Sequence, residues 1–379
     1  WIIHCCEVPI PGAPRSSFLD SFSSISASGI LADCRVCRRL CGVSIRLRMS
    51  DFSLAVRNSL AVLIALGLAI SGKRKKSLST SGAISAIFVG YVAFACSYRF
   101  GAILILFYYS SSKLTKFKQD YKAKIEEDYA VGGQRNWMQV LASSLLATVV
   151  AIAFYLLCGE DQGMSFAAPS EHDIWVEVAG LSLQQSTLAS YLWTAYIAHY
   201  CTANADTWAS ELGVLSANNP RLVTTLFWRE VPRGTNGGMS GVGTLASAAG
   251  GLFIGCVFFA GAALVPSSSA QYPVLVYSLL CGLLGSLVDS LLGASVQATY
   301  YCTERKCIVK RDGTGQGTQG SIVRICGSDV LSNEAVNLLS IMLTMLLSLY
   351  LAPITFCMVD STQCFEAQRL HSLFAGLFR

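Results

Sequence analysis

The chain has 379 residues, of which 53% are hydrophobic and only 13% charged, and its mean hydropathy is +0.50. Soluble domains usually carry about 25% charged residues, and the apolar residues here come in long blocks. These features exclude a large soluble domain and favour membrane spans. The formal net charge of +5 says little by itself.

Residues 1–48 differ in composition from the rest of the chain. The segment begins with Trp1, contains six arginines and a Ser-rich stretch, and lacks the sustained apolar core of a signal peptide. We expect it to be a disordered tail or a spurious extension of the gene, with Met49 as a plausible start. The membrane domain then spans 49–357, and a C-terminal tail follows at 358–379.

Two short motifs resemble known sites but lack essential parts. Cys34, Cys37 and Cys41 look like half of a zinc site, and no second half follows at zinc-finger spacing. The Gly-rich run at 312–320 lacks the lysine and the strand–helix context of a phosphate-binding P-loop. We therefore expect no zinc site in the first segment and a flexible loop in the second.

The apolar blocks predict a series of membrane-spanning helices, each of which needs about 20 mostly apolar residues. The blocks lie at 55–72, 82–109, 137–158, 188–204, 242–265, 274–298 and 335–357. As one helix, 82–109 would be about 42 Å long, which is too long for a bilayer core of about 30 Å without strong tilt. We therefore expect a hairpin that turns near 98–101, and an all-α, polytopic transmembrane helix bundle of about eight segments, with a range of six to nine.

The lysines and arginines support the hairpin. With it, four basic connections share one face of the membrane: 73–76, 112–136, 214–240 and 299–330. The opposite loops, 159–186 and 266–273, contain no lysine or arginine, and the first is acidic. The positive-inside rule then places the basic face in the cytosol. The arginines before residue 49 would lie on the wrong side, which is a further reason to doubt 1–48.

Two aspartates stand out because a carboxylate near the centre of a spanning helix costs about 2.5–3.5 kcal/mol to insert. Asp206 lies at the cytosolic end of one predicted span and Asp289 in the last third of another. Asn204 and Glu211 add oxygen ligands nearby, and carboxylate and amide oxygens suit Mg²⁺. We predict that both aspartates bind magnesium, that Glu211 joins them as a catalytic residue and that Asn204 helps to bind the substrate phosphate. The alternative is polar packing between helices.

The segment 229–240 has the composition of an anion site. Arg229 and Arg233 could pair with phosphate oxygens, and the following glycine-rich stretch could expose backbone N–H groups at a helix start. Its candidate phosphate-binding residues are Thr235, Asn236 and Gly237. The alternative is an ordinary loop with a helix cap.

The other candidate phosphate-binding residues lie at two further helix starts. Arg135 follows two glycines at the start of one span, and Asn333 and Asn337 share a helical face at the start of the last. Capping and interhelical hydrogen bonding are the alternative for the two asparagines.

Several strings together resemble the transmembrane protein 19 family, which includes plant phytyl-phosphate kinases. They are KKSL (75–78), SGA (81–83), SSSKLTK (110–116), GGQRNW (132–137), ADTWASE (205–211), GTNGG (234–238), DSLLGA (289–294) and NEAVNL (333–338). They follow the family's order from about residue 56 to 350. The ADTWASE string is also distantly similar to a motif of CTP-dependent polyprenol and phytol kinases, with Ala205 in place of a glycine.

The resemblance implies phosphoryl transfer from a nucleoside triphosphate, CTP or ATP, to an isoprenoid-type lipid phosphate in the membrane. Our leading hypothesis is therefore a magnesium-dependent lipid phosphotransferase with no nucleic-acid partner, in an endomembrane such as the endoplasmic reticulum. A transporter or channel could use the same acids to line a proton or cation path, and a non-catalytic membrane protein is the third possibility. Clustering of the motifs on one face favours the enzyme, because transporters place key polar groups near the midplane.

Overall fold

The computed structural model describes residues 51–125, 134–159, 161–169, 174–178, 181–225, 229–265, 270–309 and 322–377. Three features named above lie outside these residues: the 1–48 extension with its cysteines, the two glycines at 132 and 133, and the Gly-rich run at 312–320.

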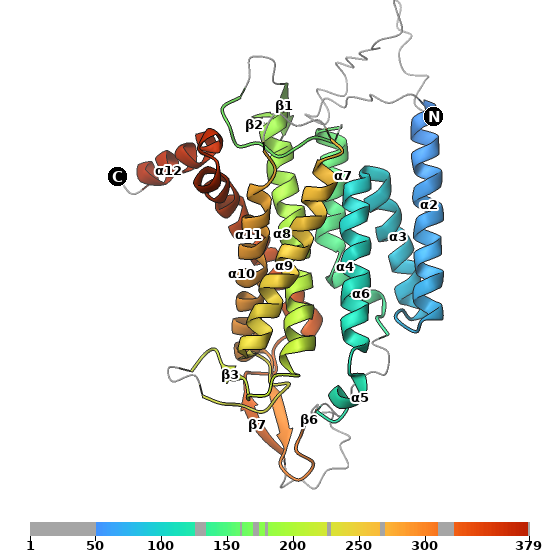
Figure 1. Cartoon of the computed structure of the whole chain (residues 1–379), viewed down its shortest axis with the longest axis vertical. Coiled ribbons are helices and arrows are strands. Elements are labelled where there is room, and N and C mark those ends of the chain that lie inside the picture. The colour runs from blue at the N-terminus through green and yellow to red at the C-terminus, as the bar shows by residue number, and fades with distance from the viewer. Residues whose placement is uncertain are drawn as a thin grey trace, which may run out of the picture.

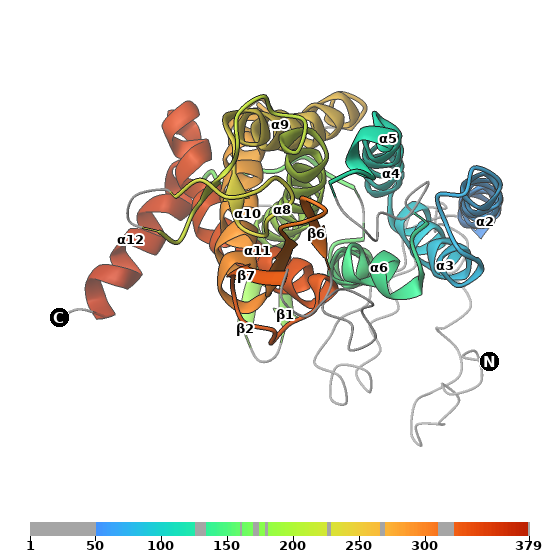
Figure 2. The same cartoon turned by 90° about the horizontal axis from the view of Figure 1, so that it is seen from below.

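Antiparallel helices run along the long axis of the molecule (Figure 1). In the first half these are α2 (Asp51–Arg74), α3 (Thr80–Cys96), α4 (Tyr98–Lys116), α5 (Gln119–Lys122), α6 (Trp137–Ala142) and α7 (Leu145–Leu157). In the second half they are α8 (Gln185–Gly213), α9 (Gly241–Ala262), α10 (Pro273–Val296) and α11 (Asn333–Val359). The 3-10 turn η1 (Ser361–Gln363) and α12 (Phe365–Leu377) follow, and α12 projects sideways from the bundle (Figure 1). Seen from below, α8 to α11 form one group, and α2 and α3 lie at the far edge beyond α4 and α6 (Figure 2).

Short strands lie at the two ends of the bundle. The hairpin of β1 (Trp175–Val178) and β2 (Leu181–Gln184) is at the upper end (Figure 1). The lower end carries the pair β3 (Arg221–Leu222) and β4 (Gly238–Met239), and a sheet of β5 (Thr299–Cys302), β6 (Cys307–Val309) and β7 (Ile322–Cys326) in the order β6-β5-β7. In the part of the chain that the structure describes, the predicted basic connections therefore lie at the lower end and the 159–186 connection at the upper end.

Four of the described helices are long and apolar enough to cross a membrane: α2 from Leu54, α9, α10 and α11. The helices α3 and α7 are apolar but shorter, with 17 and 13 residues. The predicted segment at 137–158 is split into α6 and α7 at Ser143 and Ser144. The mostly helical architecture of the described residues therefore agrees with the sequence prediction apart from the short strands, while the number of crossings, about eight, stays a prediction.

The predicted interruption within 82–109 is present, at Ser97. Its backbone is extended (φ −161°, ψ 143°), which ends α3, and its side chain accepts a hydrogen bond from the Arg99 N–H (3.1 Å) to cap α4. The two helices run in opposite directions (Figure 1), so a single long helix is excluded. Arg99 also forms an ion pair with Asp161, which ties the turn to the loop after α7.

The main core of the bundle is aromatic and surrounds α8. The ring of Phe100 on α4 packs against Trp193 on α8 and edge-on against Phe154 on α7, with ring centroids 4.2 and 5.3 Å apart. Phe258 on α9 meets the other side of Trp193 at 5.0 Å. Such pairs contribute about 0.5–1.5 kcal/mol each beyond their buried area. The core therefore orients α8 and positions the polar residues at its lower end.

The predicted C-terminal tail, 358–379, is partly helical. It contains η1 and α12, and Gln363 is almost fully buried and accepts a hydrogen bond from the Phe166 N–H (2.8 Å). A disulfide joins Cys357 to Cys364 at the upper end. No paired cysteine spacing indicated this bridge, because the two cysteines meet only where the chain turns after α11.

Candidate functional site

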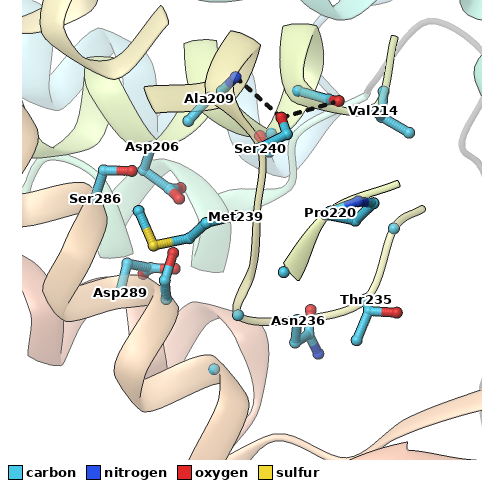
Figure 3. A pocket seen from close by; sticks show the side chains of 18 of the residues that line it. Asp206, Ala209, Val214, Pro220, Thr235, Asn236, Met239, Ser240, Ser286 and Asp289 are labelled. Carbon is cyan, nitrogen blue, oxygen red and sulfur yellow. Dashed lines mark hydrogen bonds between the residues drawn. The ribbon is translucent and has the colours of Figure 1, made fainter. Parts of the chain in front are cut away.

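Asp206 on α8 and Asp289 on α10 meet at the lower end of the bundle. Both side chains line the same cavity, and Figure 3 shows both pointing into one space. One helical turn earlier, α8 and α10 approach closely: a Cβ on Gly285 would lie 2.4 Å from Thr202 Oγ1. The absence of a side chain at Gly285 therefore lets the two aspartates come together.

The side chains of α11 hold the Asp289 carboxylate. The Ser340 hydroxyl donates to Asp289 Oδ2 at 3.0 Å. In the amide orientation that satisfies both of its neighbours, Asn337 Nδ2 donates to the same oxygen at 3.3 Å and to the Asn333 carbonyl at 3.1 Å. Asn337 thus contacts one of the two predicted metal ligands directly.

The two aspartates need a proton or a cation near their carboxyl groups. Neither carboxylate forms a salt bridge with another described residue, and adjacent carboxylates repel unless a proton or a cation lies between them. The described residues contain no group of three or more histidine, cysteine or acidic side chains arranged to bind a metal. Two carboxylates fit Mg²⁺, which is usually bound by one or two carboxylates and completes its shell with water and phosphate.

Two polar cavities meet at Asp206. Cavity I has a volume of about 320 Å³ and lies between α8, α9, α10 and the glycine-rich turn 233–240 (Figure 3). Cavity II has a volume of about 270 Å³ and lies between α6, α8 and α11. The residues that line both are Asp206, Ser210, Glu211, Asn333 and Asn337. The acids therefore stand at the junction of two spaces that could hold two substrates.

Basic side chains lie on both sides of this junction. Lys122 and Arg233 line cavity I, and Arg135 lines cavity II. Lys122 was not among the predicted residues, because nothing in the loop sequence separates it from its neighbouring lysines. Burial lowers the pKa of the Arg135 guanidinium, while the nearby Glu211 carboxylate raises it. The charges suit phosphate groups bound on either side of the aspartates.

The glycine-rich turn packs tightly against α10. Gly237 has a φ of +72°, and a Cβ there would lie 2.4 Å from the Ala294 Cβ and 2.5 Å from the Ser290 carbonyl oxygen. Only glycine accepts both the left-handed backbone and the contact. The turn brings Thr235 and Asn236 to the wall of cavity I (Figure 3). Phosphate binding by these residues stays a prediction.

The expectation of exposed N–H groups in this segment is wrong for three of them. The Asn236 N–H donates to Thr299 Oγ1 (3.2 Å), the Gly238 N–H to the Thr235 carbonyl (3.0 Å), and the Gly243 N–H to the Ser240 hydroxyl (3.1 Å). These amides hold the turn on the β5 strand and cap α9. Anion binding in cavity I is therefore left mainly to side chains.

Two of the predicted phosphate-binding residues lie away from both cavities. Asn204 is fully buried, donates to the Gly250 carbonyl (2.8 Å) and accepts from the hydroxyls of Ser110 and Ser111 (3.0 and 3.3 Å). It links α8 to α4 and α9, which is the helix-packing alternative. Arg229 donates to the Ile325 carbonyl (3.0 Å) and so binds β7. Neither residue lines cavity I or cavity II.

Glu211 is held by an ion pair at the lower end of α8. Helix α8 continues to Gly213, so no helix end between Asp206 and Glu211 makes them converge. Instead Glu211 Oε2 accepts a hydrogen bond from Lys122 Nζ at 2.6 Å. The carboxylate lines both cavities, but it is already paired with a cation.

The sequence comparisons identify the family. A model of the integral membrane protein DUF92 family matches residues 63–345. The chain belongs to this family. This DUF92 protein is thus a multi-pass integral membrane protein, and every candidate site residue from Arg135 to Asn337 falls within the matched region.

Similar curated proteins occur in a plant, an archaeon and a cyanobacterium. This DUF92 protein is 37% identical to Protein PGR of Arabidopsis thaliana over 76% of this chain and 93% of that protein. It is 26% identical to an uncharacterised membrane protein of Methanocaldococcus jannaschii over 63% of this chain and 83% of that protein. It is 27% identical to Protein VTE6, chloroplastic, of A. thaliana over 64% of this chain and 62% of that protein. No solved structure matches the chain.

Proposed function

We propose that this DUF92 protein is a lipid phosphotransferase that moves a phosphoryl group from a nucleoside triphosphate, CTP or ATP, to an isoprenoid-type lipid phosphate. The observation that carries the proposal is that Asp206 and Asp289 line one polar cavity, and that Asp206 also lines a second. The resemblance to a family that includes plant phytyl-phosphate kinases supports the same chemistry.

The described side chains would divide the work between binding and charge neutralisation. Asp206 and Asp289 would hold Mg²⁺, which neutralises the charge that develops on the phosphates during transfer. Arg233 would bind the nucleotide phosphates in cavity I, and Arg135 the lipid phosphate in cavity II. Lys122 would hold Glu211 in place beside them. A lipid phosphate oxygen would attack the γ-phosphorus, and the bond to the β,γ-bridging oxygen would break to release a nucleoside diphosphate. The attacking oxygen is already anionic, so the reaction needs no general base.

The disposition of the protein in its membrane follows from two independent features. The basic connections would face the cytosol, and the Cys357–Cys364 disulfide at the opposite end would face an oxidising compartment. We therefore propose an endomembrane such as the endoplasmic reticulum, with the nucleotide supplied from the cytosol.

The test is a transfer assay with the purified full-length protein in detergent. The protein is incubated with γ-labelled CTP or ATP and a panel of prenyl alcohols and prenyl phosphates, with Mg²⁺ or with EDTA. We expect magnesium-dependent labelling of prenyl phosphates, reduced about 100-fold or more by Asp206→Asn or Asp289→Asn, because each removes an electrostatic contact to the transition state. Glu230→Gln is the control, since Glu230 lies outside cavities I and II.

Two results would contradict the proposal. One is the absence of labelling of any prenyl phosphate by protein whose fold is intact. The other is undiminished labelling in both aspartate variants. Magnesium or proton flux through the reconstituted protein without any labelling would support a transporter in its place.

A further inference from the structure

A third cavity, cavity III, lies next to cavity II and differs from it in chemistry. Its volume is about 60 Å³, and its walls come from four helices through residues that include Leu68 on α2, Val89 on α3, Leu104 on α4 and Val140 on α6. Arg135 is the one charged residue among the described residues that line it. Cavity III is therefore an apolar space with a single cationic edge.

Cavity III is continuous in its lining with the site already described. Phe107, Arg135 and Ser143 line both cavity II and cavity III. Cavity II shares Asp206 and Glu211 with cavity I in turn. The three cavities thus form a series that passes from an apolar space, through a cationic edge, to the acids and then to the basic walls of cavity I.

The backbone of Arg135 is held firmly at this boundary. Its N–H donates to the Ser77 carbonyl, and its carbonyl accepts from the Ser79 N–H, each at 3.0 Å. A Cβ on Gly82 would lie 2.1 Å from the Arg135 carbonyl oxygen. The segment that contains Arg135 can therefore approach α3 only because residue 82 is glycine.

The guanidinium itself has room for an anion. It lies over the Phe107 ring, 5.9 Å from the centroid, and makes no salt bridge with another described residue. A partly buried, unpaired arginine at the mouth of an apolar cavity fits an amphiphile that has an anionic head.

We propose that cavity III binds the start of a single apolar chain whose phosphate group is held by Arg135 in cavity II, so that the bound molecule is a single-chain lipid monophosphate. At about 60 Å³ cavity III is much smaller than cavities I and II, so it accepts only a short stretch of an apolar chain. Cavity III therefore selects for the part of the chain nearest the phosphate. The inference rests on the proposed function only for naming this lipid as the acceptor.

The experiment measures binding of farnesyl monophosphate to the full-length protein in detergent, without nucleotide or metal. Leu104→Trp fills cavity III, and Leu106→Trp places the same side chain on the exposed face of the same helix. We expect the first to weaken binding about tenfold or more and the second to leave it unchanged. Ala86→Leu, a smaller change in the wall of cavity III, should weaken binding in the same direction if Leu104→Trp fails to fold.

Inorganic phosphate serves as the headgroup probe. Its weaker binding should be lost in Arg135→Gln but unaffected by Leu104→Trp, because it does not enter the apolar cavity. The proposal is overturned if folded Leu104→Trp and Ala86→Leu bind farnesyl monophosphate like the unmodified protein, or if inorganic phosphate binds equally tightly. This experiment measures binding and not transfer, so it separates the two proposals. If the variants bind as expected but the protein has no transferase activity, the role of cavity III stands and the proposed function is wrong. If the protein transfers phosphate but the cavity III variants bind farnesyl monophosphate normally, the proposed function stands and the role of cavity III is wrong.

Discussion

Lys122 and Glu211 form an ion pair that joins the segment after α4 to the lower end of α8. Lys122 Nζ lies 2.6 Å from Glu211 Oε2 and also donates to the Leu114 carbonyl at 2.8 Å. The lysine side chain is 3% exposed and the glutamate 15%. The pair therefore closes the lower end of the bundle beside both polar cavities.

Lys122→Met should lower the free energy of unfolding by about 1–3 kcal/mol, because it leaves the Glu211 carboxylate without its partner. Thermal unfolding in detergent measures the effect, with the exposed Lys124→Met as control. The double variant with Glu211→Gln should lose less than the sum of the two single variants. Additive losses would show that the pair contributes nothing as a pair.

The aspartate pair predicts a distinctive response to magnesium. In EDTA, Asp206→Asn and Asp289→Asn should each unfold no earlier than the unmodified protein, because each change relieves repulsion between adjacent carboxylates. Added Mg²⁺ at about 100 times its Kd should stabilise the unmodified protein by about 2.7 kcal/mol but neither variant. The double variant should resemble the single ones. If the carboxylates serve only helix packing, the variants will instead be destabilised in EDTA.

Gly237 and Gly241 make a matched pair of alanine substitutions a few residues apart. Gly237→Ala should cost about 1–3 kcal/mol in unfolding free energy and weaken nucleotide binding, because its Cβ would press on α10 and move the turn out of cavity I. Gly241→Ala meets nothing within 4 Å at the first residue of α9 and should be neutral or stabilising by up to about 1 kcal/mol. Equal effects of the two changes on nucleotide affinity would contradict the role given to the turn.

Arg99 gives a prediction at the opposite end of the molecule. Its guanidinium pairs with Asp161 and lies over the rings of Trp193 and Phe258, 4.3 and 4.8 Å from the centroids. Arg99→Met should destabilise the protein by about 3–5 kcal/mol, since Asp161 is left unpaired. Arg99→Lys should restore only part of the loss, because lysine lacks the planar group that stacks and pairs at once.

Ligand binding distinguishes this stabilising role of Arg99 from a role in the site. Arg99→Lys, where folded, should bind magnesium and nucleotide with unchanged affinity, because the cavities lie at the other end of the bundle. A change in either affinity greater than about threefold would show that the two ends are coupled.

The topology can be checked with single cysteines in a cysteine-depleted background. Glu304→Cys lies in the β5–β6 turn and Glu177→Cys in β1, both exposed and at opposite ends of the bundle. An impermeant thiol reagent should label Glu304→Cys from the cytosolic side and Glu177→Cys from the other side only. Labelling of both from one side would refute the arrangement, whichever side it is.

Much of the architecture follows from local properties of the sequence. Long apolar blocks locate the helices because each must satisfy its backbone hydrogen bonds within the bilayer, and the extended Ser97 interrupts 82–109 within one residue of the predicted turn. Asp206 and Asp289 could be selected because a carboxylate in an apolar helix is costly unless it faces a polar space. These inferences need only the composition of each segment.

The site itself was decided by contacts between distant segments. Asn204 lies two residues from Asp206 yet is buried between helices, and Arg229 binds β7 while Arg233 reaches cavity I. Lys122 enters the site through a partner 89 positions away. The direction of each side chain depends on how the helices pack. For example, α8 and α10 approach closely because Gly285 has no side chain to collide with Thr202. Such packing depends on the surfaces of two helices together and cannot be read from either segment alone.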